Sequence, residues 1–244
     1  MNKLYIVGIG PGSYEDMTIR ADQALRECEI IIGYTVYVNL IRERYPNKEY
    51  AATPMTREAE RCRMALEAAR AGRRAAIVCS GDSGIYGMAA LVYELRGDRE
   101  DPALEIIPGV TAACSGAALL GSPLTQDFAV ISLSDRLTGW DKIERKLEAA
   151  AQAGLAIVLY NPVSKSRPEH LRRACRILLR TLSPDVICGV AQNVGREGEQ
   201  VRVMRLEQLC EDKQADMFST VFIGTRQTKI LAGKMVTPRG YADV

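Results

Sequence analysis

The sequence predicts an α/β protein of two domains, each with helices on the faces of a sheet. In the first half, short apolar runs of strand length alternate with segments of helical periodicity, which is typical of a parallel sheet covered by helices. At residues 121–127, GSPLTQD, the alternation gives way to turn-forming residues. It then begins again, so we expect domains at residues 1–121 and 122–244.

In the first half, each expected strand is a short apolar run and each expected helix carries apolar residues on one side. Thr18 has a side chain suited to an N-cap, so the first helix is expected to begin there. The helix that contains TREAERCRMALEAARA is expected to end at Gly72. The expected strands are residues 4–8, 29–32, 75–79 and 104–107, and the expected helices are residues 18–27, 56–71, 86–95 and 111–120.

The second half repeats the alternation and then changes character. Four short strand-like runs separated by turns end the chain: QVRVMRL, MFSTVFIG, TKILAG and KMVTP. Because short strands joined by turns are typical of antiparallel pairing, we expect the second domain to end in antiparallel strands. Before them, the expected strands are residues 128–133, 155–160 and 186–192, and the expected helices are residues 141–153 and 168–182.

The composition argues against several classes of partner. The chain has 244 residues, with 32 Lys and Arg against 30 Asp and Glu, and this balance gives no reason to expect a nucleic-acid partner. No apolar run reaches the roughly 18 residues that a membrane span needs. The N-terminal residues lack the long apolar segment of a signal peptide, so a cytoplasmic protein without a membrane partner is expected.

Cysteine and histidine give no sign of a metal site. The 7 cysteines are scattered and include no CxxC pair, which argues against a disulfide framework and against zinc. Most of them lie in apolar runs, where they are expected to be small buried side chains. The single histidine, His170, lies in RPEHLRR near the start of a helix and is expected on the solvated surface. No metal is therefore expected.

The stretch Gly8–Ser13, GIGPGS, is close to the glycine pattern of dinucleotide-binding folds. It departs from that pattern in three ways. Ser13 stands at the third glycine, Pro11 stands where the helix should begin, and no acid ends the second strand to bind a ribose. No Walker-type phosphate loop occurs either. What remains is a glycine- and proline-shaped turn after a strand, the place where open α/β sheets bind ligands.

Two further loops of small residues also follow expected strands. CSGDSGIYG covers residues 79–87, and IPGVTAAC covers residues 107–114. Because the carboxyl ends of parallel strands lie at one edge of a sheet, these loops and Gly8–Gly12 are expected to lie together. Glycines in such loops allow a ligand to approach the backbone closely. The sequence therefore predicts a cofactor pocket lined by backbone, although each loop alone could be a plain tight turn.

Together these residues resemble the motifs of the tetrapyrrole methylases. The resemblance covers essentially the whole chain, because Tyr160–Pro162, Gln192–Glu199 and Ser219–Gly224 in the second half also resemble family motifs. It implies an S-adenosylmethionine-dependent enzyme with two αβα domains, of the class III methyltransferase type. It also implies that the cofactor is held in the cleft between the domains.

The resemblance assigns cofactor-binding roles to residues on these loops. Asp82 and Thr111 could instead cap helices, and capping and cofactor contact can coexist. The cofactor-binding residues that the resemblance implies are Gly10, Pro11, Ser80, Gly81, Asp82, Ile85, Thr111, Ala112, Tyr160, Asn161 and Gly195.

Other stretches are similar to one branch of the family, whose members methylate C(17) of a precorrin-3 type tetrapyrrole and contract its ring in cobalamin biosynthesis. They are residues 33–37, the stretches SLSD and LTGW within residues 132–140, and the tail TKILAGKMVTPRGY. The resemblance implies a precorrin substrate, precorrin-3B or its cobalt complex, and a homodimer. The sequence does not decide whether the substrate carries cobalt.

Few catalytic side chains are expected, because a sulfonium methyl group is already activated and mainly needs alignment. Ring contraction additionally needs acid–base help, for which Tyr34, Tyr37, Ser132 and Asp135 are the candidates. Tyr34 stands where siroheme-forming relatives carry a proposed acidic base. A phenol is a poor base at neutral pH but a good hydrogen-bond donor, so Tyr34 is expected to donate to an oxygen of the substrate.

Two alternatives remain open at the level of sequence. One is a related methylase that acts on another precorrin carbon, a protein side chain or ribosomal RNA, and the balanced charge disfavours RNA. The other is a non-catalytic ligand-binding module of flavodoxin-like shape. Binding of S-adenosylhomocysteine would separate the module from the methylases.

Overall fold

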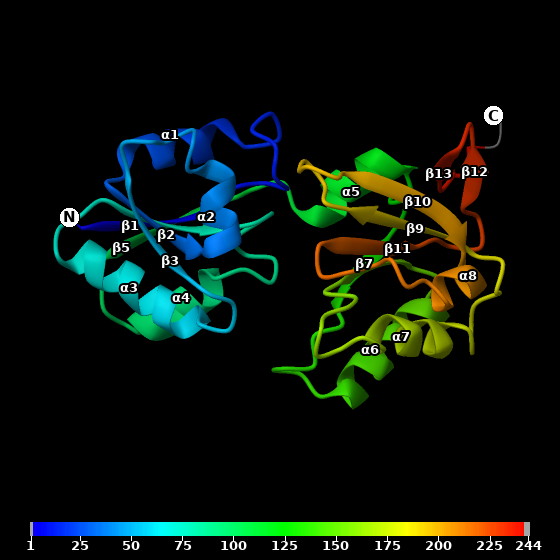
Figure 1. The fold of residues 1–244 in the computed structure, drawn as a ribbon. Coiled ribbons are helices and arrows are strands. Elements are labelled where there is room, and N and C mark those ends of the chain that lie inside the picture. Colours follow the sequence, from blue (N-terminus) through cyan, green and yellow to red (C-terminus); the bar gives the residue numbers. More distant parts are fainter. Residues whose placement is uncertain (1, 242–244) are drawn as a thin grey trace. The chain divides into compact units, whose positions relative to one another are not determined.

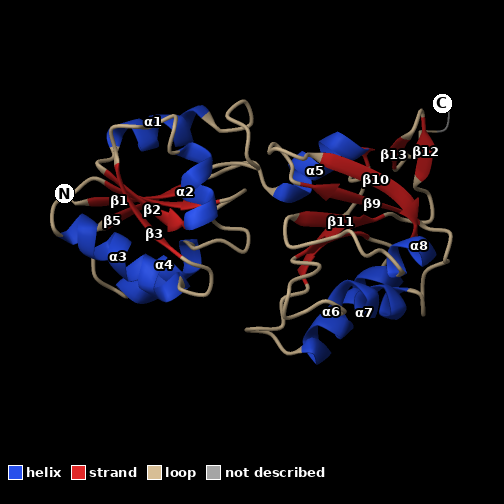
Figure 2. Ribbon diagram, viewed as in Figure 1, coloured by secondary structure: helices blue, strands red, loops and turns tan. Residues whose placement is uncertain are grey.

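The computed structural model describes residues 2–241, and the chain divides into two compact units, Met1–Ala112 and Ala113–Val244. Each unit contains a five-stranded sheet with helices beside it (Figure 1; Figure 2). The prediction of an α/β protein with two αβα domains is confirmed.

The first unit has a parallel sheet in the strand order β3-β2-β4-β1-β5. Because all pairs are parallel, the carboxyl ends of the five strands lie at one edge. The strands are β1 (Lys3–Gly8), β2 (Ile30–Tyr34), β3 (Glu49–Thr53), β4 (Ala75–Cys79) and β5 (Ala103–Ile107), and the helices are α1 (Ile19–Glu27), α2 (Thr35–Ile41), α3 (Glu58–Arg70) and α4 (Ala89–Arg96).

Alternate side chains of β1 build the two cores of this unit. Tyr5 and Val7 pack with α1 and α2 on one face of the sheet. Leu4 and Ile6 pack with α3 and α4 on the other face (Figure 1). Successive residues of a strand point to opposite faces, so a central strand that is covered on both sides needs a continuous apolar run.

The second unit has a mixed sheet in the strand order β10-β9-β11-β8-β7. Only β7 and β8 pair in parallel, and the other neighbours are antiparallel, as the sequence predicts for the end of the chain. The strands are β7 (Phe128–Ser132), β8 (Ala156–Tyr160), β9 (Ile187–Gln192), β10 (Gln200–Arg205) and β11 (Ser219–Ile223), and the helices are α5 (Ala112–Leu120), α6 (Trp140–Gln152), α7 (His170–Leu178) and α8 (Leu206–Cys210).

Helices α6, α7 and α8 cover one face of this sheet, and α5 packs against the other. The small residues of α5 allow a close approach, since a Cβ atom built on Gly116 would lie 2.8 Å from the Phe222 ring. Phe222 is fully buried there. Because α5 packs in this core, the division between the two units falls after the first residue of α5, one helix earlier than the expected boundary at residue 121.

The turn-forming residues after α5 belong to a small third sheet rather than to a linker. Its strands are β6 (Gly121–Ser122), β12 (Lys229–Leu231) and β13 (Lys234–Val236). Strand β13 pairs in parallel with β6 and antiparallel with β12. The partner of β6 is more than 100 residues away along the chain, so a local pattern could not reveal this pairing.

Most expected elements are found within a few residues of their predicted ends. Thr18 is the N-cap of α1, and its Oγ1 accepts a hydrogen bond from the Ala21 N–H at 3.2 Å. Helix α4 begins at Ala89, later than the expected residue 86. Elements α2, β3 and α8 were not predicted. Within residues 2–241, no helix is long and apolar enough to cross a membrane.

Candidate functional site

The three glycine-rich loops of the first unit meet at the carboxyl edge of its sheet, as the sequence predicts. They follow β4, β1 and β5, which are neighbours in that order. The Gly10 N–H donates to the Gly81 carbonyl at 3.1 Å, and the Gly81 N–H donates to the Gly10 carbonyl at 2.7 Å. The first two loops therefore pair backbone to backbone.

Glycine is required where the loops cross. A Cβ atom on Gly8 would lie 2.7 Å from both the Gly109 nitrogen and the Gly81 carbonyl oxygen. A Cβ atom on Gly109 would overlap the same Gly81 oxygen. Gly81 has a φ of +66°, yet a Cβ there would meet nothing closer than 3.6 Å. Gly8 and Gly109 thus permit the crossing, whereas Gly81 is needed mainly for its backbone conformation.

The Asp82 carboxylate joins two of the loops. Its Oδ1 accepts hydrogen bonds from the N–H groups of Gly84 at 2.8 Å and Ile85 at 3.2 Å. Its Oδ2 accepts one from the Gly109 N–H at 3.0 Å. Since α4 begins only at Ala89, the expectation that Asp82 caps a helix is wrong. The carboxylate instead holds a turn and ties it to the loop after β5.

The thiol at the start of the second loop is structural. Cys79 ends β4 and is buried, and burial raises the pKa of its thiol to about 11. A thiol in this state is not a nucleophile at neutral pH. Of the remaining cysteines, Cys114 is exposed and the other five are buried and unpaired, as expected for most of them.

Left-handed backbone conformations occur in the loops after several strands of both sheets. Four of the five described non-glycine residues with positive φ follow such strands: Thr56 after β3, Tyr86 after β4, Asn161 after β8 and Asn193 after β9, with φ values from +52° to +75°. The fifth, Ala232, lies in the turn between β12 and β13. Asparagine tolerates this conformation, but it is unusual for a branched or bulky side chain. Strained backbone of this kind concentrates at functional sites.

Tyr34 is the last residue of β2 and lies at the same edge as the glycine loops. Its ring meets the Tyr37 ring edge-on, with centroids 5.1 Å apart. The guanidinium carbon of Arg61 lies 5.8 Å from the Tyr34 ring centroid. The structure therefore brings two of the predicted catalytic residues together and adds Arg61, which was not predicted. Their catalytic roles stay predictions.

In the second unit, the predicted residues Tyr160, Asn161 and Ser132 lie together at the ends of β8 and β7. The Tyr160 hydroxyl accepts a hydrogen bond from the Ala113 N–H at 2.7 Å, in the first turn of α5. The Asn161 side chain donates to Ser132 Oγ at 2.9 Å. Both hydrogen bonds lie within the second unit. The role of Tyr160 and Asn161 in cofactor binding stays a prediction.

Gly195 lies in the turn after β9 and has a φ of +67°. Its N–H donates to Glu199 Oε2 at 2.7 Å, so the carboxylate closes this turn. The predicted cofactor-binding residue is thus a glycine that a left-handed turn requires.

Asp135 lies beside a histidine and an arginine. His170 Nε2 is 3.0 Å from Asp135 Oδ2, and Arg167 Nη1 is 3.8 Å from Oδ1. The His170 imidazole, with a smaller contribution from Arg167, lowers the pKa of the Asp135 carboxyl. The expectation of a solvated surface His170 is wrong, because its side chain is only 17% exposed and packs edge-on against Trp140.

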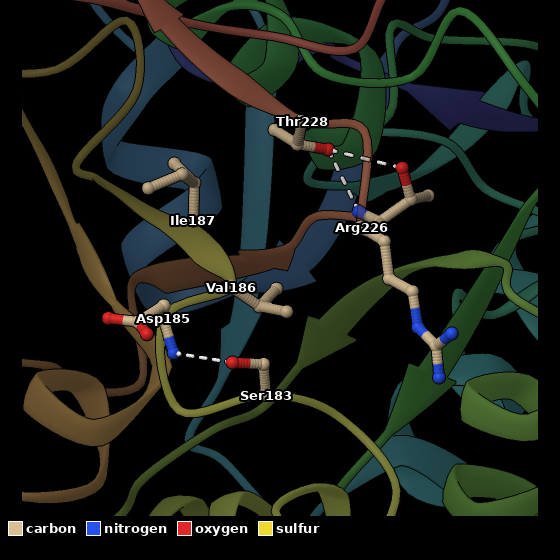
Figure 3. Close-up of a pocket in the computed structure, with 7 residues that line it drawn as sticks. Ser183, Asp185, Val186, Ile187, Arg226 and Thr228 are labelled. Atoms are coloured by element: carbon tan, nitrogen blue, oxygen red, sulfur yellow. Dashed lines mark hydrogen bonds between the residues drawn. The ribbon is translucent and has the colours of Figure 1, made fainter.

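A small pocket lies at the opposite edge of the second sheet (Figure 3). It is lined by the segment before β9, from Ser183 to Ile187, and by the segment after β11, from Thr225 to Thr228. Strand β11 runs antiparallel to both β8 and β9, so the start of β9 and the end of β11 lie at the same edge of the sheet. The end of β8, with Ser132 and Asn161 beside it, lies at the other edge. Its volume of about 170 Å³ is below the roughly 300 Å³ at which ligand pockets begin.

The chain belongs to the tetrapyrrole (corrin/porphyrin) methylases, whose family model matches residues 3–210. The fold agrees with a solved structure of the methyltransferase CobJ, with a TM-score of 0.89 and 33% identity over 98% of this chain and 100% of the other. The family resemblance predicted from the motifs is therefore confirmed.

Three curated relatives are similar over nearly the whole chain. A probable cobalt-factor III C(17)-methyltransferase of Salmonella typhimurium is 43% identical over 98% of this chain and 99% of its own length. A precorrin-3B C(17)-methyltransferase of a Sinorhizobium species is 38% identical over 98% of this chain and 97% of its own. A cobalt-factor III methyltransferase of Priestia megaterium is 42% identical over 98% of this chain, which spans only 45% of that longer protein.

Proposed function

We propose that this protein transfers a methyl group from S-adenosylmethionine to C(17) of a precorrin-3 type tetrapyrrole in cobalamin biosynthesis. The observation that carries the proposal is the 38% and 43% identity, over nearly the whole chain, with two relatives whose names give C(17) methylation. Membership of a methylase family also argues against a non-catalytic ligand-binding module.

For the cofactor, we propose the backbone of the three loops in the first unit as the principal binding surface. The residues fit this role, because glycines let the three loops meet backbone to backbone at the edge where α/β sheets bind ligands. S-adenosylmethionine supplies an activated methyl group when bound. The residues proposed here are Gly10, Pro11, Ser80, Gly81, Ile85, Thr111 and Ala112, with Asp82 holding the loops together.

Contacts of the cofactor with Tyr160, Asn161 and Gly195, and a cofactor position between the two domains, are implied by the family resemblance and stay predictions. The hydrogen bonds that these three residues make within the second unit do not argue against such contacts. A backbone carbonyl or an unused lone pair could still accept a hydrogen bond from the ligand.

For the chemistry, we propose that the Tyr34 hydroxyl donates a hydrogen bond to a substrate oxygen while the ring contracts. A positioned donor at a developing oxyanion stabilises it without being ionised itself. Tyr37, Ser132 and Asp135 are the further candidates for moving protons. Of these, Asp135 is held as a carboxylate by the groups beside it, so it suits a base better than an acid.

Ring contraction, a homodimer and a cytoplasmic location are proposed on the family resemblance alone. The relatives' names include both cobalt-containing and cobalt-free substrates, so both are candidate substrates.

The test is incubation with S-adenosylmethionine and either precorrin-3B or its cobalt complex, with the mass and absorption spectrum of the product recorded. A product one methyl group heavier, with the spectrum of a contracted ring, is expected. Binding of S-adenosylhomocysteine without methylation of either compound would favour a related methylase with another substrate. Absence of that binding would contradict the methyltransferase assignment.

A further inference from the structure

Arg61 is a buried cation that forms no ion pair with an acidic side chain of residues 2–241. It lies on α3 and is only 4% exposed. Its Nε donates to Thr53 Oγ1 at 2.9 Å, and its Nη2 donates to the Pro54 carbonyl at 3.0 Å. Its Nη1 lies 3.9 Å from Met88 Sδ. Among the ion pairs of the described residues, none involves Arg61, although most other arginines of the first unit are paired.

A charge in this position costs stability. Moving a guanidinium out of water is unfavourable, and hydrogen bonds to neutral oxygens compensate only in part. The two hydrogen bonds to Thr53 and Pro54 hold the chain after β3, but a neutral donor could do the same. The charge itself is therefore the feature that packing does not explain.

The guanidinium lies near Tyr34, the residue proposed to donate to a substrate oxygen. Thr53 and Tyr34 are paired residues at the ends of neighbouring strands β3 and β2. The Arg61 carbon at 5.8 Å from the Tyr34 ring is within the range of a cation–π interaction. Its positive potential therefore acts where the Tyr34 hydroxyl is proposed to meet a substrate oxygen.

The β3–α3 loop, residues 54–57, shows strain at the same place. Thr56 has a φ of +75°, which is unfavourable for a branched side chain. Arg61 holds the first residue of this loop through the Pro54 carbonyl. An uncompensated charge and a strained backbone thus coincide at one edge, and both are features that concentrate at functional sites.

We propose that Arg61 is a positioning residue for the substrate: its buried charge makes the edge formed by Tyr34 and the β3–α3 loop the place where a carboxylate or oxyanion of the tetrapyrrole binds. The inference rests on the proposed function, since precorrins are polycarboxylates. Arg61 acts through the electrostatic potential at this edge and through Tyr34. Its side chain is too buried to make extensive contact with the ligand itself.

The test compares Arg61→Met, which removes the charge at similar volume, with Arg61→Lys, which keeps it. Thr53→Val is the matched control, because it removes one hydrogen bond of Arg61 but leaves the charge. Uroporphyrin serves as the anionic tetrapyrrole probe by fluorescence titration. S-adenosylhomocysteine binding and the melting temperature report on the cofactor loops and the fold.

We expect Arg61→Met to weaken uroporphyrin binding by about tenfold or more, as for the loss of a nearby buried charge. Arg61→Lys and Thr53→Val should stay within about threefold of the parent. S-adenosylhomocysteine affinity should not change. The melting temperature of Arg61→Met should equal or exceed that of Thr53→Val, because an unpaired buried charge has been removed.

Unchanged uroporphyrin binding by Arg61→Met would overturn the inference and leave the proposed function intact. An equal loss in Thr53→Val would also overturn it, since holding the chain after β3 would then be the whole role of Arg61. If the parent protein binds S-adenosylhomocysteine but no uroporphyrin, the inference is overturned, because the carboxylates of a tetrapyrrole are then not attracted to this edge. Should Arg61→Met not fold, Arg61→Gln against Arg61→Lys makes the same comparison of charge.

Discussion

The carboxyl edge of the first sheet and the edge of the second sheet where β7 and β8 end are built from different chemistry. In the first unit, Gly8, Gly81 and Gly109 bring the backbones of three loops into contact. In the second unit, side chains occupy the edge, with Asn161 bonded to Ser132 and Asp135 beside His170.

This difference decides which of the two edges tolerates single amino-acid substitutions. The crossing at Gly8 and Gly109 cannot be altered one group at a time, because an added Cβ there would displace a neighbouring loop. Side chains can be exchanged singly, and they can titrate. We therefore expect substitutions of Gly8 and Gly109 to affect fold and cofactor binding together, and substitutions in the second edge to affect single interactions.

The largest effect is expected for Gly109→Ala. Its Cβ would overlap the Gly81 carbonyl and lie 2.7 Å from the Gly8 oxygen, so the loops must separate. We expect a loss of about 3 kcal/mol in the free energy of unfolding, at the upper end of overpacking effects. Binding of S-adenosylhomocysteine should be lost as well. Urea unfolding and calorimetric titration measure the two effects.

Gly154→Ala is the control for this change. Gly154 follows α6 with a φ of +70°, and a Cβ there would meet nothing within 4 Å. It should cost only about 1 kcal/mol, the usual penalty of a left-handed alanine, and leave binding unchanged. Equal stability of the two variants would mean that the crossing of the loops does not need Gly109.

Tyr34→Phe should leave the fold and the cofactor affinity unchanged, since only a hydroxyl is removed. Turnover should fall by roughly ten- to ten-thousand-fold, the range for a positioned proton donor. Tyr93→Phe, at an exposed position on α4, is the matched control. Parent-like turnover by Tyr34→Phe would remove the phenol from the chemistry and direct attention to Asp135 and Ser132.

Gly81→Val should weaken S-adenosylhomocysteine binding by about tenfold, because a branched residue disfavours the left-handed conformation of this loop. Local strain, rather than a clash, is the cause, since space for a Cβ exists at Gly81. Gly154 also has a positive φ, +70°, and lies outside the loops. Gly154→Val should therefore bind S-adenosylhomocysteine with the affinity of the parent. Titration calorimetry compares them, and equal affinities would exclude the Gly81 loop from the site.

The smallest effect is expected for Asp135→Asn. The pKa of this carboxyl is lowered in the folded state, so its ionised form stabilises the fold above its usual value of 3.8. At pH 7 the variant should lose about 0.5 kcal/mol, a small value because the group is partly exposed. The difference should shrink as the pH falls below the usual value and the carboxyl protonates. Urea unfolding at pH 7 and at a pH below 3.8 measures the difference in stability. A difference that stays constant between them would contradict a stabilising role of the Asp135 carboxylate.

The first edge could be predicted from sequence, because its signals are local. Each loop follows a short apolar strand and precedes a helix, and parallel pairing then places the loops together. The N-cap at Thr18 and the antiparallel end of the chain are also local signals. Strand β3 was missed because EYAAT is a half-exposed edge strand without a strong apolar run.

The second edge could not be predicted in the same way. His170 meets Asp135 because the loops after β7 and β8 lie side by side, and nothing near His170 in the sequence reveals that pairing. The strand β6 likewise depends on a partner at the end of the chain. Arg61 did have a signal, since it stands four residues before Ala65 on the apolar side of α3, where a charged residue is unexpected.

The most direct test of the proposed function uses S-adenosylmethionine that carries ¹³C in its methyl group. After turnover with precorrin-3B or its cobalt complex, ¹³C nuclear magnetic resonance locates the label in the product. We predict one labelled methyl group on C(17) of a contracted ring. A label on another ring carbon, or no label in either product, would contradict the proposed function.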